Sequence, residues 1–141
     1  MTESSSKARW EGDLKSGKGT MTVGPDRWTG SYTFASRFEG SGDAATPEEL
    51  LGAAHAGCFS MAFSNMAAGA GHTPESVETT AVVHLGKVDD KPAITKVALT
   101  MEASIPGMDE DAFQELAEKA KAGCPVSKLF DTEIVLDARL R

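Results

Sequence analysis

Two cysteines, Cys58 and Cys124, are the residues of this chain whose chemistry could be covalent or redox. The thiolate form of cysteine is a nucleophile, whereas a thiol buried among apolar residues is usually inert. The two positions are far apart in the sequence, so only the fold could bring them together. A catalytic or redox pair and two inert core thiols therefore both remain open on this pattern.

The segments around the two cysteines predict different surroundings for their thiols. Cys124 precedes Pro125 at the expected start of a short helix, where free backbone N–H groups and the helix dipole favour a thiolate. Cys58 lies near the middle of a long helix expected over residues 46–68. Its thiolate would need a cation nearby.

A metal site is one alternative use of the histidines. His55 lies three residues before Cys58 and shares its helix face, and His72, His84 and Cys124 could add ligands. No CxxC or HxxxH pair is present, and no spacing matches a standard zinc site. We therefore expect no metal or other cofactor, and we expect His55 to be satisfied by a hydrogen bond or by a partner subunit.

Arg37 is the candidate for a cation that serves the site. It lies between Phe34 and Phe38, next to a glycine-rich loop, and is expected at the end of the third strand. From there it could point inward at a buried anion or serve as an ordinary strand-end cation.

Two carboxylates, Glu48 and Glu49, open the long helix behind Thr46. Glu49 completes a capping box with Thr46, which leaves Glu48 to complement the helix dipole or to reach a partner. Glu48 precedes Cys58 by ten residues, which is about 15 Å of helix rise. If both residues serve one site, Glu48 must come from a second subunit, unless the helix is broken near Gly52.

The elements that must position these residues fit an α+β fold. The long helix is uncharged beyond its first turn and is expected to be buried, and an intertwined homodimer would supply the cover that one small sheet cannot. The 141 residues are expected to form a single domain, 1–141, with residues 1–6 frayed. The other expected elements are a three-stranded antiparallel meander over 7–36, a hairpin of strands 77–88 and 94–105 around a turn at 87–93, helices over 109–122 and 125–130, and a strand over 132–140.

Composition narrows the classes of partner. The formal net charge of -7 argues against a nucleic-acid or anionic-membrane surface. No run of apolar residues is long enough for a membrane span, and the N-terminal residues lack an apolar signal core. We therefore expect a cytoplasmic protein, where a static disulfide between the two cysteines is not expected.

Four segments together resemble the OsmC/Ohr family of thiol peroxidases, and its OsmC branch in particular. They are RWEGDLKSGKG, SRFEG, TPEELLGAAHAGCFSMA and AKAGCPVS. The resemblance runs from about residue 7 to residue 141. The string His55-Ala56-Gly57 before Cys58, where the Ohr branch has a Tyr-containing string, favours the OsmC branch.

The resemblance implies an intertwined homodimer, with antiparallel sheets packed around two long central helices and two active sites at the subunit interface. It implies reduction of organic hydroperoxides to alcohols, with Cys58 oxidised to a sulfenic acid and Cys124 resolving it as a disulfide. Arg37 would lower the pKa of the Cys58 thiol, and Glu48 would hold Arg37 in place. An external dithiol, by family expectation of the lipoyl type, would recycle the pair.

Other functions of the same fold stay open beside this one, namely a non-enzymatic redox or stress-response binding protein and a structural dimer with inert thiols. A peroxidase of this kind is expected to favour hydroperoxides with an organic tail over hydrogen peroxide, because apolar residues surround the thiol. The expected apolar wall consists of Leu51, Phe59, Met61, Phe38 and Phe130.

Overall fold

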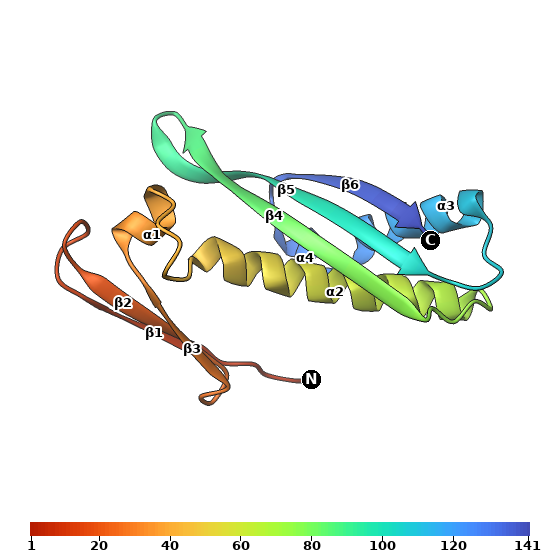
Figure 1. The fold of residues 1–141 in the computed structure, drawn as a ribbon, viewed down its shortest axis with the longest axis horizontal. Coiled ribbons are helices and arrows are strands. Elements are labelled where there is room, and N and C mark those ends of the chain that lie inside the picture. Colours follow the sequence, from red (N-terminus) through yellow and green to blue (C-terminus); the bar gives the residue numbers. More distant parts are fainter. The chain divides into compact units, whose positions relative to one another are not determined.

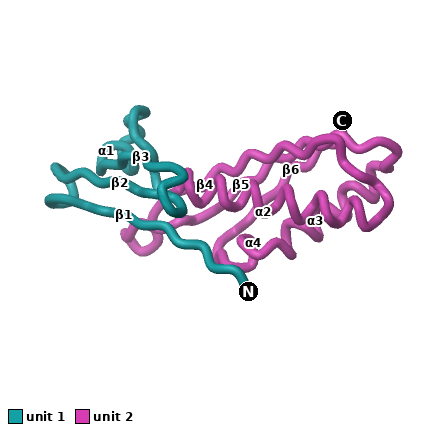
Figure 2. Tube along the Cα trace, turned by 90° about the horizontal axis from the view of Figure 1, so that it is seen from below, with its two compact units in different colours: residues 1–47 teal, residues 48–141 magenta.

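The computed structural model describes residues 1–141, which divide into two compact units, Met1–Pro47 and Glu48–Arg141 (Figure 2). Each unit contains one three-stranded sheet, so the chain has the mixed α+β architecture that the sequence predicts. None of its helices combines the length and the apolar character that a membrane crossing requires.

The first unit is built on an antiparallel meander, as predicted. Its strands pair in the order β1, β2, β3, with every neighbouring pair antiparallel. Gly24 and Asp26, in the turn between the second and third strands, have positive φ angles of 61° and 65°. Glycine and aspartate tolerate this left-handed region better than most residues, which explains why the chain turns here. The strands are β1 (Ser6–Glu11), β2 (Lys18–Val23) and β3 (Trp28–Tyr32).

A short helix, α1 (Phe34–Phe38), follows β3 where the sequence pattern predicted the end of the strand. Thr33 Oγ1 accepts a hydrogen bond from the Ser36 N–H at 3.0 Å, and Ser36 Oγ accepts one from the Thr33 N–H at 2.9 Å. This reciprocal capping box closes a helical turn directly after the strand. The prediction that Arg37 ends a strand is therefore wrong, because Arg37 lies in the last turn of α1.

The second unit packs helices against one side of its sheet (Figure 1; Figure 2). Its sheet has the order β4, β5, β6. Phe59 and Phe63 of α2 and Phe113 of α3 meet the inward side chains of β5 in a core from which solvent is excluded. The elements are α2 (Pro47–Gly69), β4 (Ser76–Val88), β5 (Lys91–Ser104), α3 (Glu110–Gly123), α4 (Pro125–Leu129) and β6 (Glu133–Leu140).

Two features of this sheet differ from the sequence-based expectation. The hairpin turn is limited to Asp89 and Asp90, with φ angles of 50° and 62°, and the strands run into the segment 87–93 that was predicted as turn. Two successive residues at positive φ match the twist of the flanking strands, and aspartate tolerates that conformation. β6 pairs with β5 in parallel, so the expectation of antiparallel sheets is wrong for this pair. The chain crosses through α3 and α4 between the two strands, and such a crossover connects parallel neighbours.

Helix α2 begins at Pro47 and continues without interruption to Gly69. Its buried residues lie on one face, whereas Met61 has 77% of its surface exposed in the single chain. A Cβ at Gly52 would lie 3.1 Å from the Ala81 carbonyl oxygen, so glycine lets α2 approach β4 closely here. Gly52 thus serves packing, and the alternative of a helix broken in this region is wrong.

We expect Phe63→Ala to destabilise the protein by about 3–5 kcal/mol, since it leaves a cavity in the core. Phe63 is fully buried and packs edge-on against Phe113, with ring centroids 5.5 Å apart. Urea unfolding at a fixed protein concentration measures the change. Lys119→Ala on the exposed face of α3 is the control, and its effect should stay within about 0.5 kcal/mol. Equal losses for both variants would contradict this description of the core.

Candidate active site

The two cysteines lie together in the unit Glu48–Arg141. Cys58 is partly buried in α2, and Cys124 is fully buried at the N-cap of α4, directly after α3. Cys58 packs against the buried cluster to which Cys124 belongs, and the two thiols are close enough for Cys124 to raise the pKa of Cys58. Both are free thiols in this structure. The fold therefore brings together two thiols that lie 66 residues apart in the sequence.

The surroundings of Cys58 favour its neutral form. Burial raises the pKa of the Cys58 thiol above its ordinary value, while a hydrogen bond from the Val126 backbone N–H to the sulfur opposes the rise. The neighbouring Cys124 raises the pKa further, through a side-chain hydrogen bond and through charge repulsion. With these groups alone the thiol is mostly protonated at neutral pH, so its use as a nucleophile requires an additional cation.

Cys124 is held by Ser127, which is itself held by His55. The Ser127 backbone N–H donates to Cys124 Sγ at 3.4 Å, and the Ser127 hydroxyl lies 3.1 Å from the same sulfur. Ser127 Oγ also lies 2.7 Å from His55 Nε2. The His55 ring is fully buried, with the Phe130 ring edge-on at 5.2 Å, and burial lowers the pKa of His55. The expectation that a hydrogen bond satisfies His55 is confirmed at Nε2.

Ser127 and the Val126 N–H are contributors that the sequence reading missed. The spacing Cys124-Pro125-Val126-Ser127 places a hydroxyl three residues after a residue that caps a helix, which is a common hydrogen-bonding pattern. That spacing was the available signal. The first turn of α4 thus acts on both sulfurs: the Ser127 N–H donates to Cys124 Sγ, and the Val126 N–H lowers the pKa of Cys58.

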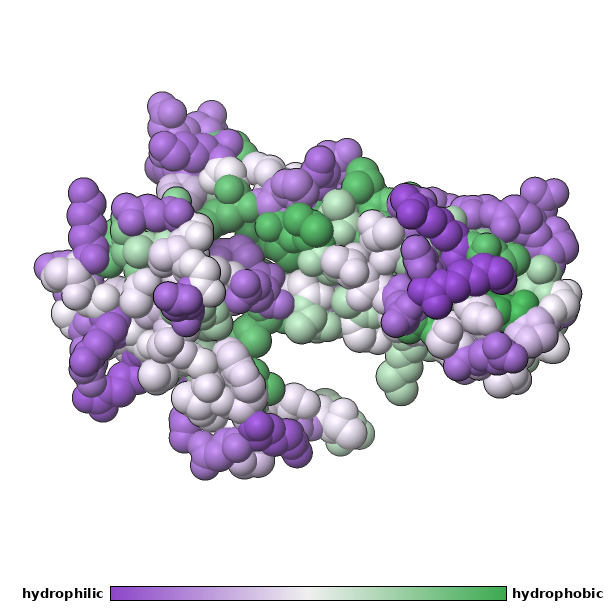
Figure 3. Space-filling view, in the orientation of Figure 1, coloured by the Kyte–Doolittle hydropathy of each residue, from purple (hydrophilic) through white to green (hydrophobic).

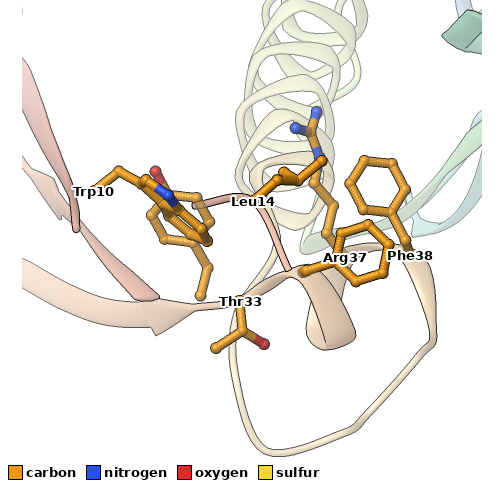
Figure 4. A pocket seen from close by; sticks show the side chains of 7 residues that line it. Trp10, Leu14, Thr33, Arg37 and Phe38 are labelled. Atoms are coloured by element: carbon orange, nitrogen blue, oxygen red, sulfur yellow. The ribbon is translucent and has the colours of Figure 1, made fainter. Parts of the chain in front are cut away.

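Arg37 lies in the other unit, Met1–Pro47, where it lines a pocket of about 240 Å³. Its guanidinium carbon is 5.3 Å from the centroid of the Phe38 ring, a distance that permits a cation–π interaction. Figure 4 shows Trp10 on one side of this pocket and Arg37 with Phe38 on the other. The full lining consists of Trp10, Leu14, Tyr32, Thr33, Phe34, Arg37 and Phe38.

Glu48 lies in the first turn of α2 and is 7% exposed. Because α2 is continuous, Glu48 and Cys58 of one chain are separated by about 15 Å along the helix axis. A single chain therefore does not bring the Glu48 carboxylate to the Cys58 sulfur.

The predicted apolar wall is divided in the structure. Leu51 and Phe130 line a second pocket of about 180 Å³ in the unit Glu48–Arg141. Phe59 belongs to the closed core, and Met61 is largely exposed in the single chain. No group of three or more His, Cys, Asp or Glu side chains is arranged to hold a metal ion.

Comparison with known proteins gives a consistent assignment. The family described as OsmC-like protein matches residues 40–139. The chain is 52% identical over 136 residues to peroxiredoxin OsmC of Escherichia coli K12, covering 96% of this chain and 94% of that protein. It is 32% identical over 87 residues to an organic hydroperoxide resistance protein of Xanthomonas axonopodis pv. citri, covering 61% of this chain and 59% of that protein.

The fold also has a close counterpart among solved structures. An OsmC-like protein of unknown function from Vibrio cholerae O1 biovar eltor superposes with a TM-score of 0.76 at 21% identity, covering 98% of this chain and 99% of that one. At this identity the likeness concerns the fold alone. The family match over residues 40–139, together with the relative that is 52% identical, shows that this chain belongs to the OsmC family.

Proposed function

We propose that this protein is a thiol peroxidase that reduces organic hydroperoxides to alcohols with Cys58 and Cys124. The observation that carries the proposal is that the fold packs Cys58 against the buried cluster that includes Cys124, close enough for Cys124 to raise the pKa of the Cys58 thiol. The names of the relatives, a peroxiredoxin and an organic hydroperoxide resistance protein, support the same chemistry. Residues 1–141 would act as one OsmC-like domain.

The reaction has two steps within the protein. The Cys58 thiolate attacks the O–O bond of the hydroperoxide, and the alkoxide that leaves takes up a proton to become the alcohol, while Cys58 becomes a sulfenic acid. Cys124 then attacks the Cys58 sulfur, hydroxide leaves and is protonated to water, and a disulfide forms. An external dithiol, of the lipoyl type by family expectation, reduces that disulfide by exchange. A cytoplasmic location, where thiols are kept reduced, suits this recycling.

Arg37 supplies the cation that the Cys58 surroundings lack. A guanidinium beside the sulfur would lower the pKa that burial raises, and its N–H groups could donate hydrogen bonds to the peroxide oxygens. Glu48 would hold the guanidinium through a bidentate ion pair. In this arrangement the ion pair of Arg37 and Glu48 favours the thiolate form of Cys58. The two cysteine sulfurs form and break the covalent bonds.

A homodimer completes the site in this proposal. Glu48 cannot reach Cys58 along its own uninterrupted helix, so the Glu48 that serves one Cys58 would come from the second subunit. Apolar side chains reach the surface of the single chain, as the green patches of Figure 3 show, and partner contacts would cover part of that surface. The most exposed large apolar residues of the second unit include Met61, Val82 and Leu129.

A thiol count after treatment with hydroperoxide tests the proposed function. With one equivalent of cumene hydroperoxide per chain, the wild-type protein should lose both free thiols and form an intramolecular disulfide, seen by mass spectrometry. Cys124→Ser should convert Cys58 to a sulfenic acid without a disulfide. Two unreacted thiols in the wild type would exclude the peroxidase and leave the binding-protein and inert-dimer alternatives.

Subunit complementation tests whether Glu48 acts across the interface. Glu48→Gln and Cys58→Ser, each inactive alone, should regain activity when unfolded together and refolded as mixed dimers. Half of randomly remixed dimers are mixed and each has one intact site, so about one quarter of wild-type activity is expected. Restoration fails if Glu48 and Cys58 of the same chain share a site, because every site then carries a defect.

A further inference from the structure

We infer that His55 is a positioning residue for the resolving cysteine, acting through Ser127 to aim Cys124 at Cys58. The three residues form one hydrogen-bonded chain, His55 to Ser127 to Cys124, called here the His55–Ser127 relay. Both of its contacts are short, 2.7 Å from His55 Nε2 to Ser127 Oγ and 3.1 Å from Ser127 Oγ to Cys124 Sγ. The inference rests on the proposed function and concerns its second chemical step.

The second ring nitrogen of His55, Nδ1, indicates which atom is the donor in the hydrogen bond between His55 and Ser127. His55 is fully buried, and its Nδ1 has no hydrogen-bond partner in the chain. A buried N–H without an acceptor is rarer in proteins than a buried acceptor without a donor. We therefore assign the proton to Nε2, which donates to Ser127 Oγ and leaves Nδ1 as the bare nitrogen.

With its oxygen occupied as an acceptor, the Ser127 hydroxyl is oriented to donate to Cys124 Sγ. The sulfur then receives two hydrogen bonds from one residue, from the hydroxyl and from the Ser127 backbone N–H. Two donors suit a sulfur that carries negative charge, since a thiolate accepts hydrogen bonds and has none to give. Burial lowers the pKa of His55, so the ring stays neutral and the direction of the relay does not change near neutral pH.

The resolving step uses this arrangement without any additional reagent. As Cys124 Sγ attacks, the new S–S bond forms while the S–O bond of the Cys58 sulfenic acid breaks. The departing hydroxide takes up a proton equal to the one that the Cys124 thiol loses, which gives water. The Cys124 sulfur is oxidised and the Cys58 sulfur is reduced, so the electrons balance within the pair. The relay stabilises the negative charge on Cys124 Sγ and keeps this sulfur oriented toward the sulfur of Cys58.

His55→Leu is expected to slow disulfide formation about 10- to 100-fold. Without the Nε2 donor the Ser127 hydroxyl is no longer oriented toward Cys124 Sγ, and this range corresponds to losing that hydrogen bond to a charged sulfur. The alcohol released in the first turnover should form at the wild-type rate, because the relay does not touch the reacting oxygen. The sulfenic acid at Cys58 should live longer, so trapping with dimedone and over-oxidation to sulfinic acid should both increase. Rapid mixing with one equivalent of cumene hydroperoxide, quenching at set times and mass spectrometry measure the rates of alcohol formation and disulfide formation.

Three further variants distinguish positioning from a general loss of structure. His55→Gln keeps an N–H donor near the Nε2 position and should recover most of the resolving rate, whereas a structural role would not depend on that donor. Ser127→Ala should reproduce the defect of His55→Leu. Ser60→Ala removes a 2.7 Å hydrogen bond from α2 to Thr79 of β4, outside the relay, and should resolve at the wild-type rate.

The outcomes separate this inference from the proposed function. A wild-type protein that forms no alcohol and no disulfide overturns the proposed function itself. A wild-type protein that forms both, with His55→Leu and Ser127→Ala resolving equally fast, overturns the relay alone. Slow resolution in His55→Leu that His55→Gln does not improve would also overturn it, because the N–H donor would then be irrelevant.

Discussion

Cys58→Ser is expected to abolish turnover of organic hydroperoxides, with a loss on the order of 10³-fold or more. A serine hydroxyl ionises far less readily than a thiol and does not form the sulfenic acid on which the second step depends. The replacement is nearly isosteric in the middle of α2, so the fold should persist, and circular dichroism can verify this. Loss of cumene hydroperoxide in the presence of excess dithiol measures the rate.

Cys124→Ser is the matched control for that experiment. It removes the other thiol of the pair but leaves Cys58, so one alcohol per chain should form before the reaction slows. If Cys58→Ser retained wild-type turnover, the assignment of Cys58 as the attacking group would be wrong.

Arg37→Met is expected to slow the first step about 10- to 1,000-fold at neutral pH, the effect of one to three pKa units. The rate is expected to fall because the reaction depends on the ionised form of the Cys58 thiol. Burial already raises the pKa of Cys58. In the proposed site, removal of the Arg37 guanidinium would raise that pKa further, so less thiolate would be present at a given pH. The deficit should shrink as the pH is raised, because the thiol ionises in both proteins in alkaline solution. A pH–rate profile of alcohol formation measures the shift.

Two variants give this prediction its controls. Arg37→Lys keeps the charge but not the planar fork, so an intermediate rate is expected. Arg27→Met removes an exposed arginine from the same unit and should leave the profile unchanged. A profile for Arg37→Met that superimposes on the wild type would show that Arg37 does not act on Cys58.

The helices α2, α3 and α4 and most strands were predictable because their signals are local. Pro47 suits the first position of a helix, and α2 begins there. Asp109 caps α3 through hydrogen bonds to the next turn, as its position before the amphipathic run suggests. Alternating residues predicted β4 and β5, although the extent of their turn depended on Asp89 and Asp90 adopting positive φ.

Local signals failed where two of them competed or where the partner was distant. The alternation of β3 continues past Tyr32, but the Thr33–Ser36 capping box ends it and places Arg37 in a helix. The parallel pairing of β6 with β5 depends on the path of the chain through α3 and α4. The alternation of residues within a strand does not reveal the direction of the strand beside it. The spacing of His55 and Cys58 placed them on one helix face, yet it did not reveal that Ser127 would occupy the space beside His55.

Residue types and short spacings were sufficient to nominate the two cysteines, the continuous apolar helix and the family to which the chain belongs. These properties depend on neighbours within a few positions, where backbone geometry leaves few arrangements. Three features arose only in the folded chain: the proximity of Cys58 to Cys124, the influence of the first turn of α4 on both sulfurs, and the hydrogen bond between His55 and Ser127. They join segments whose separation in sequence carries no geometric information, so packing of the core decides them.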